Sequence, residues 1–237
     1  MVDIHSHLLF GIDDGAEDLE ESLRMVYAAQ EAGVKTIIAT PHFREHIINP
    51  EKTYENYSVL LEKIKDTNVE VRLGFEIMLN PMLEKIIDVV EKHSINGTDY
   101  LLVEFSHFTF GEQGMRLLEL LYRYRFIPVI AHPERVKGGF SRKKTIKMLK
   151  EMGCLMQINA GSIIGIYGQG AKRMAKYLIK KKMADFVASD AHSERFYKWY
   201  GEAYKHVVRW SDEEYANDLF FNNGRKLLGG EYIAAKL

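Results

Sequence analysis

The sequence predicts one α/β domain in which helices cover a parallel β-sheet that closes into a barrel. Short aliphatic or β-branched segments alternate with longer segments of helical apolar spacing along the chain. The short segments are continuously apolar, which is typical of strands buried on both faces of a parallel sheet. A length of 237 residues fits a single domain spanning residues 1–237, because β/α barrels of this size are usually one domain. A doubly wound open sheet is the alternative, since periodicity does not distinguish the two.

Seven strands are expected from the apolar segments. They comprise residues 2–7, 36–40, 69–75, 100–105, 127–131, 154–159 and 184–189. The expected helices comprise residues 19–31, 54–64, 83–90, 117–124, 146–152 and 174–182, where apolar residues recur at helical spacing. Residues 194–237 are expected to be largely helical, with breaks or caps at 222–224 and 229–230. The glycine-rich segment 161–170 predicts a loop.

The composition excludes several classes of function. Hydrophobic residues make up 46% and charged residues 27% of the chain, as in ordinary soluble globular proteins. A net charge of −1 does not fit binding to nucleic acid or to an anionic membrane. No apolar segment is long enough to insert into a membrane, and no signal-peptide pattern precedes Asp3. The single cysteine, Cys154, excludes an intrachain disulfide and favours the reducing cytoplasm.

The first expected strand carries two histidines that point the same way. His5 and His7 are two residues apart, and such side chains share a face of a strand. Asp13 and Asp14 follow after one short loop. Imidazole nitrogens and carboxylate oxygens at this spacing can surround one divalent cation. Taken alone, the His-x-His pair is equally consistent with two ordinary surface residues.

The later strands decide between these interpretations, because six of the seven end in potential metal ligands. In parallel α/β folds the chemistry lies in the loops at the carboxyl ends of the strands. The ligand-capable residues at the later ends are His42, Glu76, Glu104, His132, Asp190 and His192. Glu104 lies inside an apolar strand, where a carboxylate without a partner or a metal costs several kcal/mol. Only the sixth strand, which ends in Gln157-Ile158-Asn159, lacks a histidine or carboxylate.

The donor set predicts a metal centre with more than one ion. All its donors are nitrogen or oxygen and none is a thiolate, which favours manganese, iron or zinc in a catalytic rather than structural site. About nine ligands are too many for one ion, so two or three ions are expected, with a bridging carboxylate. Such clusters commonly hydrolyse phosphate esters.

These segments resemble the PHP (polymerase and histidinol phosphatase) superfamily. The motifs DIHSHLLFGIDDGAED, ATPHF, GFEI, LLVEF and PVIAHPERV are similar to those of bacterial manganese-dependent tyrosine-protein phosphatases of the CpsB/YwqE type, which act on capsule and exopolysaccharide kinases. The resemblance covers residues 2 to about 192. It implies a distorted seven-stranded (β/α)7 TIM-like barrel, the PHP fold, with three divalent metal ions, manganese foremost and iron or zinc as alternatives.

The resemblance also implies roles for individual residues. One metal would take His5, His7, Glu76 and Asp190; a second, bridged by Glu76, would take Glu104 and His132; a third would take Asp14, His42 and His192. Asp14 is preferred over Asp13 by analogy only. Arg135 matches the phosphate-binding arginine of the family, and Arg135, His42 and Asp14 would be catalytic. Tyr197 occupies the spacing of a second family arginine, so Arg195 is the expected substitute in substrate binding.

The function expected from this resemblance is hydrolysis of phosphotyrosine on a bacterial tyrosine kinase that controls capsule or exopolysaccharide synthesis. A phosphatase for a small metabolite such as histidinol phosphate would use the same metals and is one alternative. A non-catalytic PHP module that binds partners is another, and an oligomer is compatible with the sequence. A cysteine-based tyrosine phosphatase needs an arginine six positions after its cysteine, whereas Ala160 stands there relative to Cys154. We therefore expect Cys154 to be a buried, inert thiol.

Overall fold

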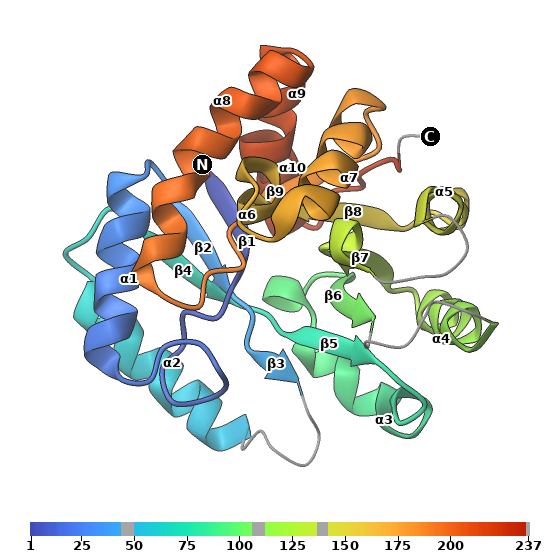
Figure 1. Cartoon of the computed structure of the whole chain (residues 1–237). Helices are drawn as coiled ribbons and strands as arrows, with labels where there is room; N and C mark the ends of the chain where they lie inside the picture. Colours follow the sequence, from blue (N-terminus) through green and yellow to red (C-terminus); the bar gives the residue numbers. More distant parts are fainter. Residues whose placement is uncertain (44–49, 106–111, 137–141, 236–237) are drawn as a thin grey trace.

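The computed structural model describes residues 1–43, 50–105, 112–136 and 142–235. The strands form two parallel sheets, in the orders β1-β2-β4 and β3-β5-β6-β7-β8-β9. Their bounds are β1 Val2–Ser6, β2 Thr36–Ala39, β3 His42–Phe43, β4 Glu70–Leu73, β5 Glu76–Leu79, β6 Tyr100–Phe105, β7 Ile127–Ala131, β8 Leu155–Asn159 and β9 Phe186–Ala188. Figure 1 shows the helices arranged around the outside of these strands.

The two sheets surround a distorted barrel that is not closed as expected, and β2 and β4 are each followed by a second short strand, β3 and β5, that lies beyond the expected segment. β2 is followed by β3 after Pro41, and β4 by β5 after Gly74 and Phe75. Proline has no backbone N–H to donate to a ladder, which accounts for the interruption at Pro41. The ring continues from β9 to β1 through a parallel bridge between Ser6 and Ala191. The expected strand 69–75 was therefore wrong in its extent, since the chain bends at Gly74 and resumes as β5.

The helices largely follow the expected pattern. Their bounds are α1 Leu19–Glu31, α2 Pro50–Ile64, α3 Leu83–Val90, α4 Glu112–Arg123, α5 Arg142–Glu151, α6 Ala160–Ile164, α7 Gly168–Lys180, α8 Tyr200–Trp210, α9 Glu213–Asn217 and α10 Asn223–Leu228. Short turns of 3₁₀ helix lie at η1 Glu91–His93, η2 Ile95–Gly97, η3 Pro133–Arg135 and η4 Glu194–Trp199, and a π-helical turn, η5, at Asp218–Asn222. In the described part of the chain, no helix has both the length and the apolar character needed to cross a membrane.

Two expected loops or breaks are helical in the structure. Segment 161–170 contains α6 and the start of α7 rather than a loop, and a Cβ on Gly161 would lie 2.8 Å from the Tyr167 ring. Positions 222–224 continue the helix from η5 into α10, where a Cβ on Gly224 would lie 2.7 Å from Val2. These glycines therefore serve close packing inside helices. The expected end at Gly229 is confirmed, since it caps α10.

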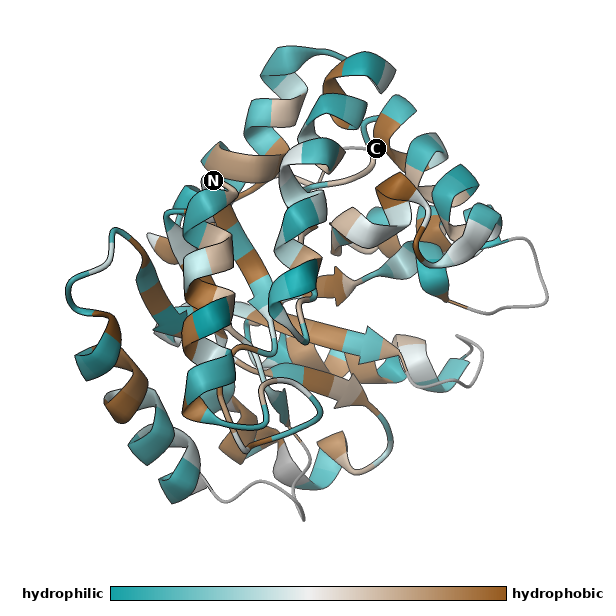
Figure 2. Ribbon diagram, turned by 60° about the vertical axis from the view of Figure 1, so that its left-hand side comes forward, coloured by the Kyte–Doolittle hydropathy of each residue, from teal (hydrophilic) through white to brown (hydrophobic). Residues whose placement is uncertain are grey.

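The barrel interior is apolar at the amino ends of the strands and polar at their carboxyl ends. Figure 2 shows hydrophobic residues along the strands and hydrophilic ones on the outward helix faces. The interior apolar cluster includes Ile4, Ile38, Leu102, Val129, Leu155 and Phe186, together with Leu227 and Ile233 of the C-terminal segment. Side chains two residues further along a strand share its face, so Glu104 follows Leu102 and Gln157 follows Leu155. The fold therefore places polar side chains above the apolar interior cluster, at the end of the barrel where the strands have their carboxyl ends.

Candidate metal centre

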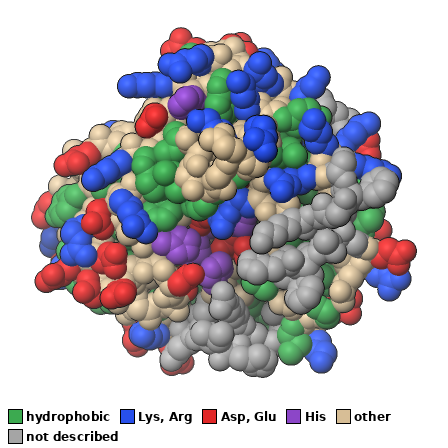
Figure 3. All heavy atoms as spheres, in the orientation of Figure 1, with side chains coloured by type: hydrophobic (Ala, Val, Ile, Leu, Met, Phe, Trp, Pro, Cys, Tyr) green, Lys and Arg blue, Asp and Glu red, His purple; other side chains and the backbone are tan. Residues whose placement is uncertain are grey.

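The structure brings all nine predicted ligand residues together at one end of the barrel, with His42 and Glu76 at the first residues of β3 and β5 and Asp14 in the loop after β1. Three sets have one donor atom per residue within 4.8 Å of one another. The sets are His7, Asp14, His42 and His192; His5, His7 and Asp190; and His42, Glu76 and Glu104. The ninth residue, His132, places its Nε2 atom 3.3 Å from Glu76 Oε1 and 3.6 Å from Glu104 Oε1. Figure 3 shows histidine and carboxylate side chains together near the middle of this face.

The neighbours of His5 and His7 determine which ring nitrogen faces the cluster. Nδ1 of His5 lies 2.9 Å from Gln157 Oε1, and Nδ1 of His7 lies 2.7 Å from Asp13 Oδ2. Because both partners are acceptors, each Nδ1 carries the hydrogen and donates it. In the neutral rings, the two Nε2 lone pairs then face each other 3.2 Å apart. Two lone pairs repel at this separation, so this arrangement fits a cation between them.

Glu76 lies at the centre of the cluster and contacts four imidazoles. Its Oε2 atom is 3.3 Å from His5 Nε2, 3.4 Å from His7 Nε2 and 3.0 Å from His42 Nδ1. Its other oxygen, Oε1, faces His132 and is buried without a hydrogen-bond donor among the described residues. A buried carboxylate with one oxygen toward each of two groups of nitrogen ligands has the geometry of a bridging ligand.

Asp190 divides its two oxygens between the cluster and the protein around it. Oδ1 lies 3.4 Å from Nε2 of both His5 and His7. Oδ2 accepts hydrogen bonds from Asn159 Nδ2 at 2.6 Å and Arg135 Nη1 at 3.0 Å. The backbone of Asp190 has a φ of +51° and that of His132 a φ of +33°. Non-glycine residues seldom adopt this left-handed region, and such strain is concentrated at functional sites.

The structure distinguishes the two neighbouring aspartates that the sequence could not. Asp13 is 7% exposed and receives hydrogen bonds from the ring of His7 and from the backbone N–H groups of His42 and Gly15. Asp14 is 66% exposed, and its Oδ1 atom lies 3.5 Å from His42 Nε2 and 3.7 Å from His192 Nε2. Asp13 therefore orients the His7 ring by binding Nδ1, the nitrogen that points away from the cluster, whereas Asp14 faces the cluster itself.

The electrostatics of the cluster favour positive charge at its centre. Burial opposes protonation of His5, but the carboxylates of Glu76 and Asp190 outweigh it and raise the His5 pKa to about 9. Burial alone would raise the pKa of Glu76, yet His5 and its neighbours hold that pKa well below its usual range. Burial and the charge of Glu76 raise the pKa of Glu104. The raised pKa values of His5 and Glu104 reflect neighbouring carboxylates, and the lowered pKa of Glu76 shows that its carboxylate is stabilised by the positive charge around it, so divalent cations would be stabilised at this place.

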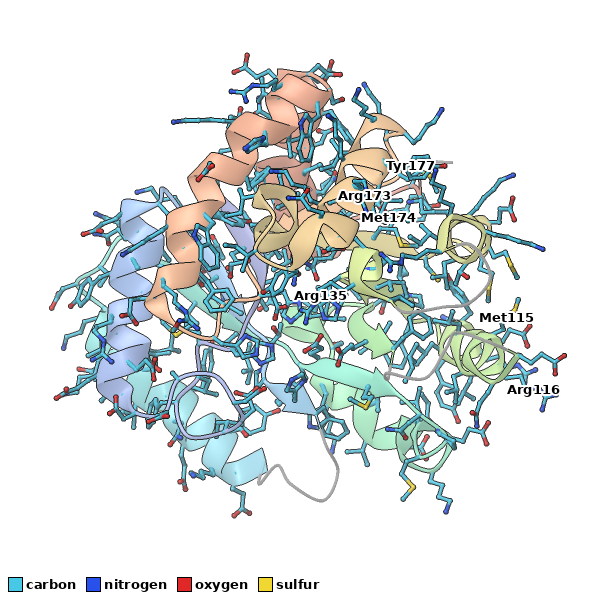
Figure 4. The ribbon with its side chains drawn as sticks, in the orientation of Figure 1. Met115, Arg116, Arg135, Arg173, Met174 and Tyr177 are labelled. Carbon is cyan, nitrogen blue, oxygen red and sulfur yellow. The ribbon has the colours of Figure 1, made fainter. Side chains whose placement is uncertain are left out.

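A cavity of about 500 Å³ opens beside the cluster. Its lining includes Glu104, His132, Arg135, Arg142 and Tyr167. The Arg135 guanidinium lies 4.4 Å from the centre of the Tyr167 ring, a cation–π contact that fixes its position. In Figure 4, Arg135 lies between the cluster and α7. The cavity therefore presents a fixed cation next to the predicted metal ligands.

The second predicted substrate residue lies further out. Arg195 is exposed, and its guanidinium lies 5.6 Å from the ring of Phe196, which in turn is 6.0 Å from His192. Arg195 does not line the described cavity, so its part in substrate binding remains a prediction. Tyr197 is fully buried and donates a hydrogen bond to Ser6 Oγ at 3.0 Å. The tyrosine at this position therefore holds the end of β1 by a buried hydrogen bond and does not face the substrate.

Sequence reasoning missed the residues that hold the ligands in place. Gln157 accepts from His5 and donates to Asn159, which donates to Asp190. This chain of hydrogen bonds connects two predicted ligands from different strands. The available signal was the pair of polar residues at the end of the sixth strand, which is otherwise apolar. Outer hydrogen-bond partners of this kind orient metal ligands and set their tautomers.

The fold and the site together define a β/α-barrel protein with a candidate multinuclear metal centre. The family model for CpsB/CapC, proteins of capsular polysaccharide synthesis, matches residues 1–229. The chain belongs to this family. It is 32% identical to the tyrosine-protein phosphatase CpsB of Streptococcus agalactiae, over 98% of this chain and 100% of the relative. It is also 32% identical to the tyrosine-protein phosphatase YwqE of Bacillus subtilis, over 92% and 87% of the two chains.

Solved structures show the same fold. The chain resembles a structure from the crystallographic description of YwqE of Bacillus subtilis and CpsB of Streptococcus pneumoniae, metal-dependent tyrosine phosphatases. The TM-score is 0.89 at 31% identity, covering 100% of this chain and 97% of that one. Histidinol phosphate phosphatase of Lactococcus lactis, solved with zinc, histidinol and phosphate, matches with a TM-score of 0.60 at 14% identity, covering 89% and 94%. The second match shows the fold alone.

Proposed function

We propose that this protein is a metal-dependent protein-tyrosine phosphatase that acts on a phosphotyrosyl protein, a bacterial tyrosine kinase of capsule or exopolysaccharide synthesis. The observation that carries the proposal is the convergence of imidazole and carboxylate donors around Glu76, next to the fixed guanidinium of Arg135. The names of the two curated relatives support the choice of phosphotyrosine. The cytoplasmic location expected from the single cysteine belongs to the same proposal.

The proposed ligands divide into three groups around Glu76. The grouping follows the family resemblance, and the position of Glu76 between His5, His7, His42 and His132 supports it as the ligand that would bridge two ions. The first metal would be held by His5, His7, Glu76 and Asp190, the second by Glu76, Glu104 and His132, and the third by Asp14, His42 and His192. Nitrogen and oxygen donors without thiolate favour manganese, with iron and zinc as alternatives. Bound ions would supply Lewis-acid stabilisation of the phosphoryl oxygens and an acidified water nucleophile.

The protein's own residues would bind the phosphoryl group and leave the aromatic ring in the cavity. Arg135 presents several N–H donors in a planar fork, which can hold two phosphoryl oxygens. Its ion pair with Asp190 and its contact with Tyr167 aim this fork before substrate arrives. Preorganised charge of this kind stabilises the transition state without reorganisation. No covalent intermediate on the enzyme is needed.

Asp14 and His42 are the proposed catalytic residues at the exposed edge of the cluster. The side chain of His42 is 15% exposed and that of Asp14 is 66% exposed, so both face the direction from which a protein substrate approaches. Their position suits holding a water beside the departing phenolate oxygen, and that water would supply the proton that this oxygen takes up as it leaves. A phenolate is a better leaving group than an alkoxide, so this assistance need only be modest.

The proposal is tested by phosphate release from protein that has been stripped of metal and reloaded with manganese. The substrates to compare are a phosphotyrosyl peptide, a phosphoseryl peptide and histidinol phosphate. We expect preference for phosphotyrosine and loss of all activity with a chelator. Preference for histidinol phosphate would replace the protein substrate by a metabolite, and no release from any substrate by the metal-loaded protein would contradict the assignment.

A further inference from the structure

Positive charge is concentrated in one part of this nearly neutral chain. Residues 142–182 contain eleven Lys and Arg but one acidic residue, Glu151, whereas the whole chain has 32 basic and 33 acidic residues. The remaining residues therefore carry 21 basic and 32 acidic side chains. This segment includes α5 and α7. Figure 3 shows Lys and Arg gathered over α7 and toward α5, with many Asp and Glu on the opposite side, over α1 and α2.

The two helices form the walls of a groove that carries part of this charge. The groove has a volume of about 390 Å³ and is lined by Lys143, Lys144, Lys147, Tyr177, Lys181 and Met183. The four lysines are exposed, and they come from both sides of the groove. Lys143 Nζ lies 4.3 Å from the centre of the Tyr177 ring, so one ammonium group is held over an aromatic surface. The groove thus combines several cations with an apolar strip.

The groove lies along the same two helices as the cavity beside the predicted metal ligands. That cavity is lined by Arg142, the first residue of α5, and by Gly170 and Ala171 in the first turn of α7. The groove lies between the same helices further along. In Figure 4, Arg173, Met174 and Tyr177 follow α7 away from Arg135. At 1.5 Å of rise per residue, the groove extends from about 9 to about 15 Å beyond Ala171 along α7.

We propose that the groove between α5 and α7 binds acidic side chains that flank the phosphotyrosine of the protein substrate. This inference rests on the proposed phosphatase function. An extended peptide advances about 3.3 Å per residue, so for a phosphotyrosine ring placed in the cavity beside Ala171 the contacting acidic residues lie about three to five positions away. Charge complementarity of this kind raises association rates and selects partners. A concave groove between the same two helices that flank the cavity fits a peptide better than it fits a flat membrane surface.

The test compares peptides that differ only in their flanks. Each has one phosphotyrosine, with glutamates three to five positions before it, with glutamates three to five positions after it, or with glutamines at all these positions. The groove variant combines Lys143→Gln, Lys147→Gln and Lys181→Gln. The control variant combines Lys63→Gln, Lys205→Gln and Lys226→Gln, which are exposed lysines of α2, α8 and α10 with the same total charge change.

For the wild-type protein at low salt, we expect kcat/KM for one acidic peptide to exceed that for the neutral peptide by about tenfold. The groove variant should lose this preference, while the control variant keeps it. All three proteins should hydrolyse p-nitrophenyl phosphate equally, because this small substrate does not reach the groove. Raising the salt concentration should lower the wild-type preference and leave the groove variant unchanged.

Fluorescence anisotropy of the same labelled peptides separates failure of this inference from failure of the proposed function. If phosphotyrosyl peptides are hydrolysed and bound without regard to their flanks, the groove proposal is overturned and the phosphatase stands. If none is hydrolysed, the phosphatase fails, and flank-dependent binding that the groove variant loses would still support acidic docking. If phosphatidylserine vesicles, and not acidic peptides, bind the wild type but not the groove variant, the groove is a membrane site and the inference is wrong.

Discussion

The buried ion pair of Lys150 and Asp185 and the cluster at the strand ends place charge inside the same protein in different ways. Lys150 Nζ lies 2.7 Å from Asp185 Oδ2, which also accepts the backbone N–H of Met156, and both side chains are almost fully buried. There, one cation faces one anion. In the cluster, imidazole nitrogens and carboxylates converge on shared space, and the hydrogens on Nδ1 of His5 and His7 point outward. In the Lys150–Asp185 pair each buried charge is compensated by its partner. In the cluster, nitrogen and carboxylate donors face one another, so an additional cation is required between them.

The largest effect should follow removal of a proposed ligand from the cluster. We expect Glu104→Ala and His132→Ala each to lower kcat/KM for a phosphotyrosyl peptide by about a thousandfold or more, because they remove the site's stabilisation of developing charge. Circular dichroism should show an intact fold. Turnover close to that of the wild type in both variants would remove the basis for the proposed centre.

Breaking the buried Lys150–Asp185 ion pair should have the opposite effect from removing a ligand. We expect the protein to lose stability but to keep most of its activity. Lys150→Met leaves Asp185 buried without its cation, and we expect the free energy of unfolding to fall by about 3–5 kcal/mol in urea titrations. Lys147→Met, one turn away on the exposed face of α5, should change it by about 0.5 kcal/mol or less. Equal effects of the two substitutions would show that the buried pair has no special role in folding.

An intermediate effect is expected for residues behind the ligands. Asp13→Asn weakens the acceptor of His7 Nδ1, and Gln157→Ala removes the acceptor of His5 Nδ1. Each should weaken metal affinity by about 10–100-fold, the range found for outer partners of metal-bound histidines. The measurement is competition with a metal-sensitive chelating dye. Affinity unchanged in both variants would mean that the imidazoles are oriented by packing alone.

The smallest effect is expected for Cys154. The thiol is fully buried, and burial raises its pKa to about 11, so it stays protonated at neutral pH. Cys154→Ser should leave phosphatase activity within about twofold of the wild type, since only a thiolate is a strong nucleophile. Iodoacetamide should react with the thiol only after unfolding. Complete loss of activity in a folded Cys154→Ser protein would point to cysteine chemistry instead.

Much of the barrel could be predicted because its strands and helices have distinct apolar periods. Eight of the nine predicted ligands lie at or near the end of an expected strand, and parallel strands bring such positions to one edge, whereas Asp14 lies in the loop after β1. The choice between Asp13 and Asp14 could not be predicted, since it depends on a loop that turns one carboxylate inward and the other outward. Spacing along the sequence contains no information on that turn.

Other errors came from glycines and from short strands. Segment 161–170 was predicted to be a loop and 222–224 a break or cap, but Gly161 and Gly224 each lie in a helix that packs closely against another side chain. That neighbour is distant in sequence in the case of Gly224 and Val2. The division of two strands depends on Pro41 and on the bend at Gly74, and β3 has only two residues. Such features depend on tertiary packing, and the spacing of apolar residues along the sequence does not predict them.

Calorimetric titration of manganese into metal-stripped protein shows whether the convergent donors hold divalent metal. We expect saturable binding that approaches three ions per chain, with a rise in the thermal unfolding temperature, because binding to the folded state stabilises it. The His132→Ala variant should bind fewer ions. Absence of saturable binding, or equal binding by the wild type and this variant, would show that the cluster is not a metal centre.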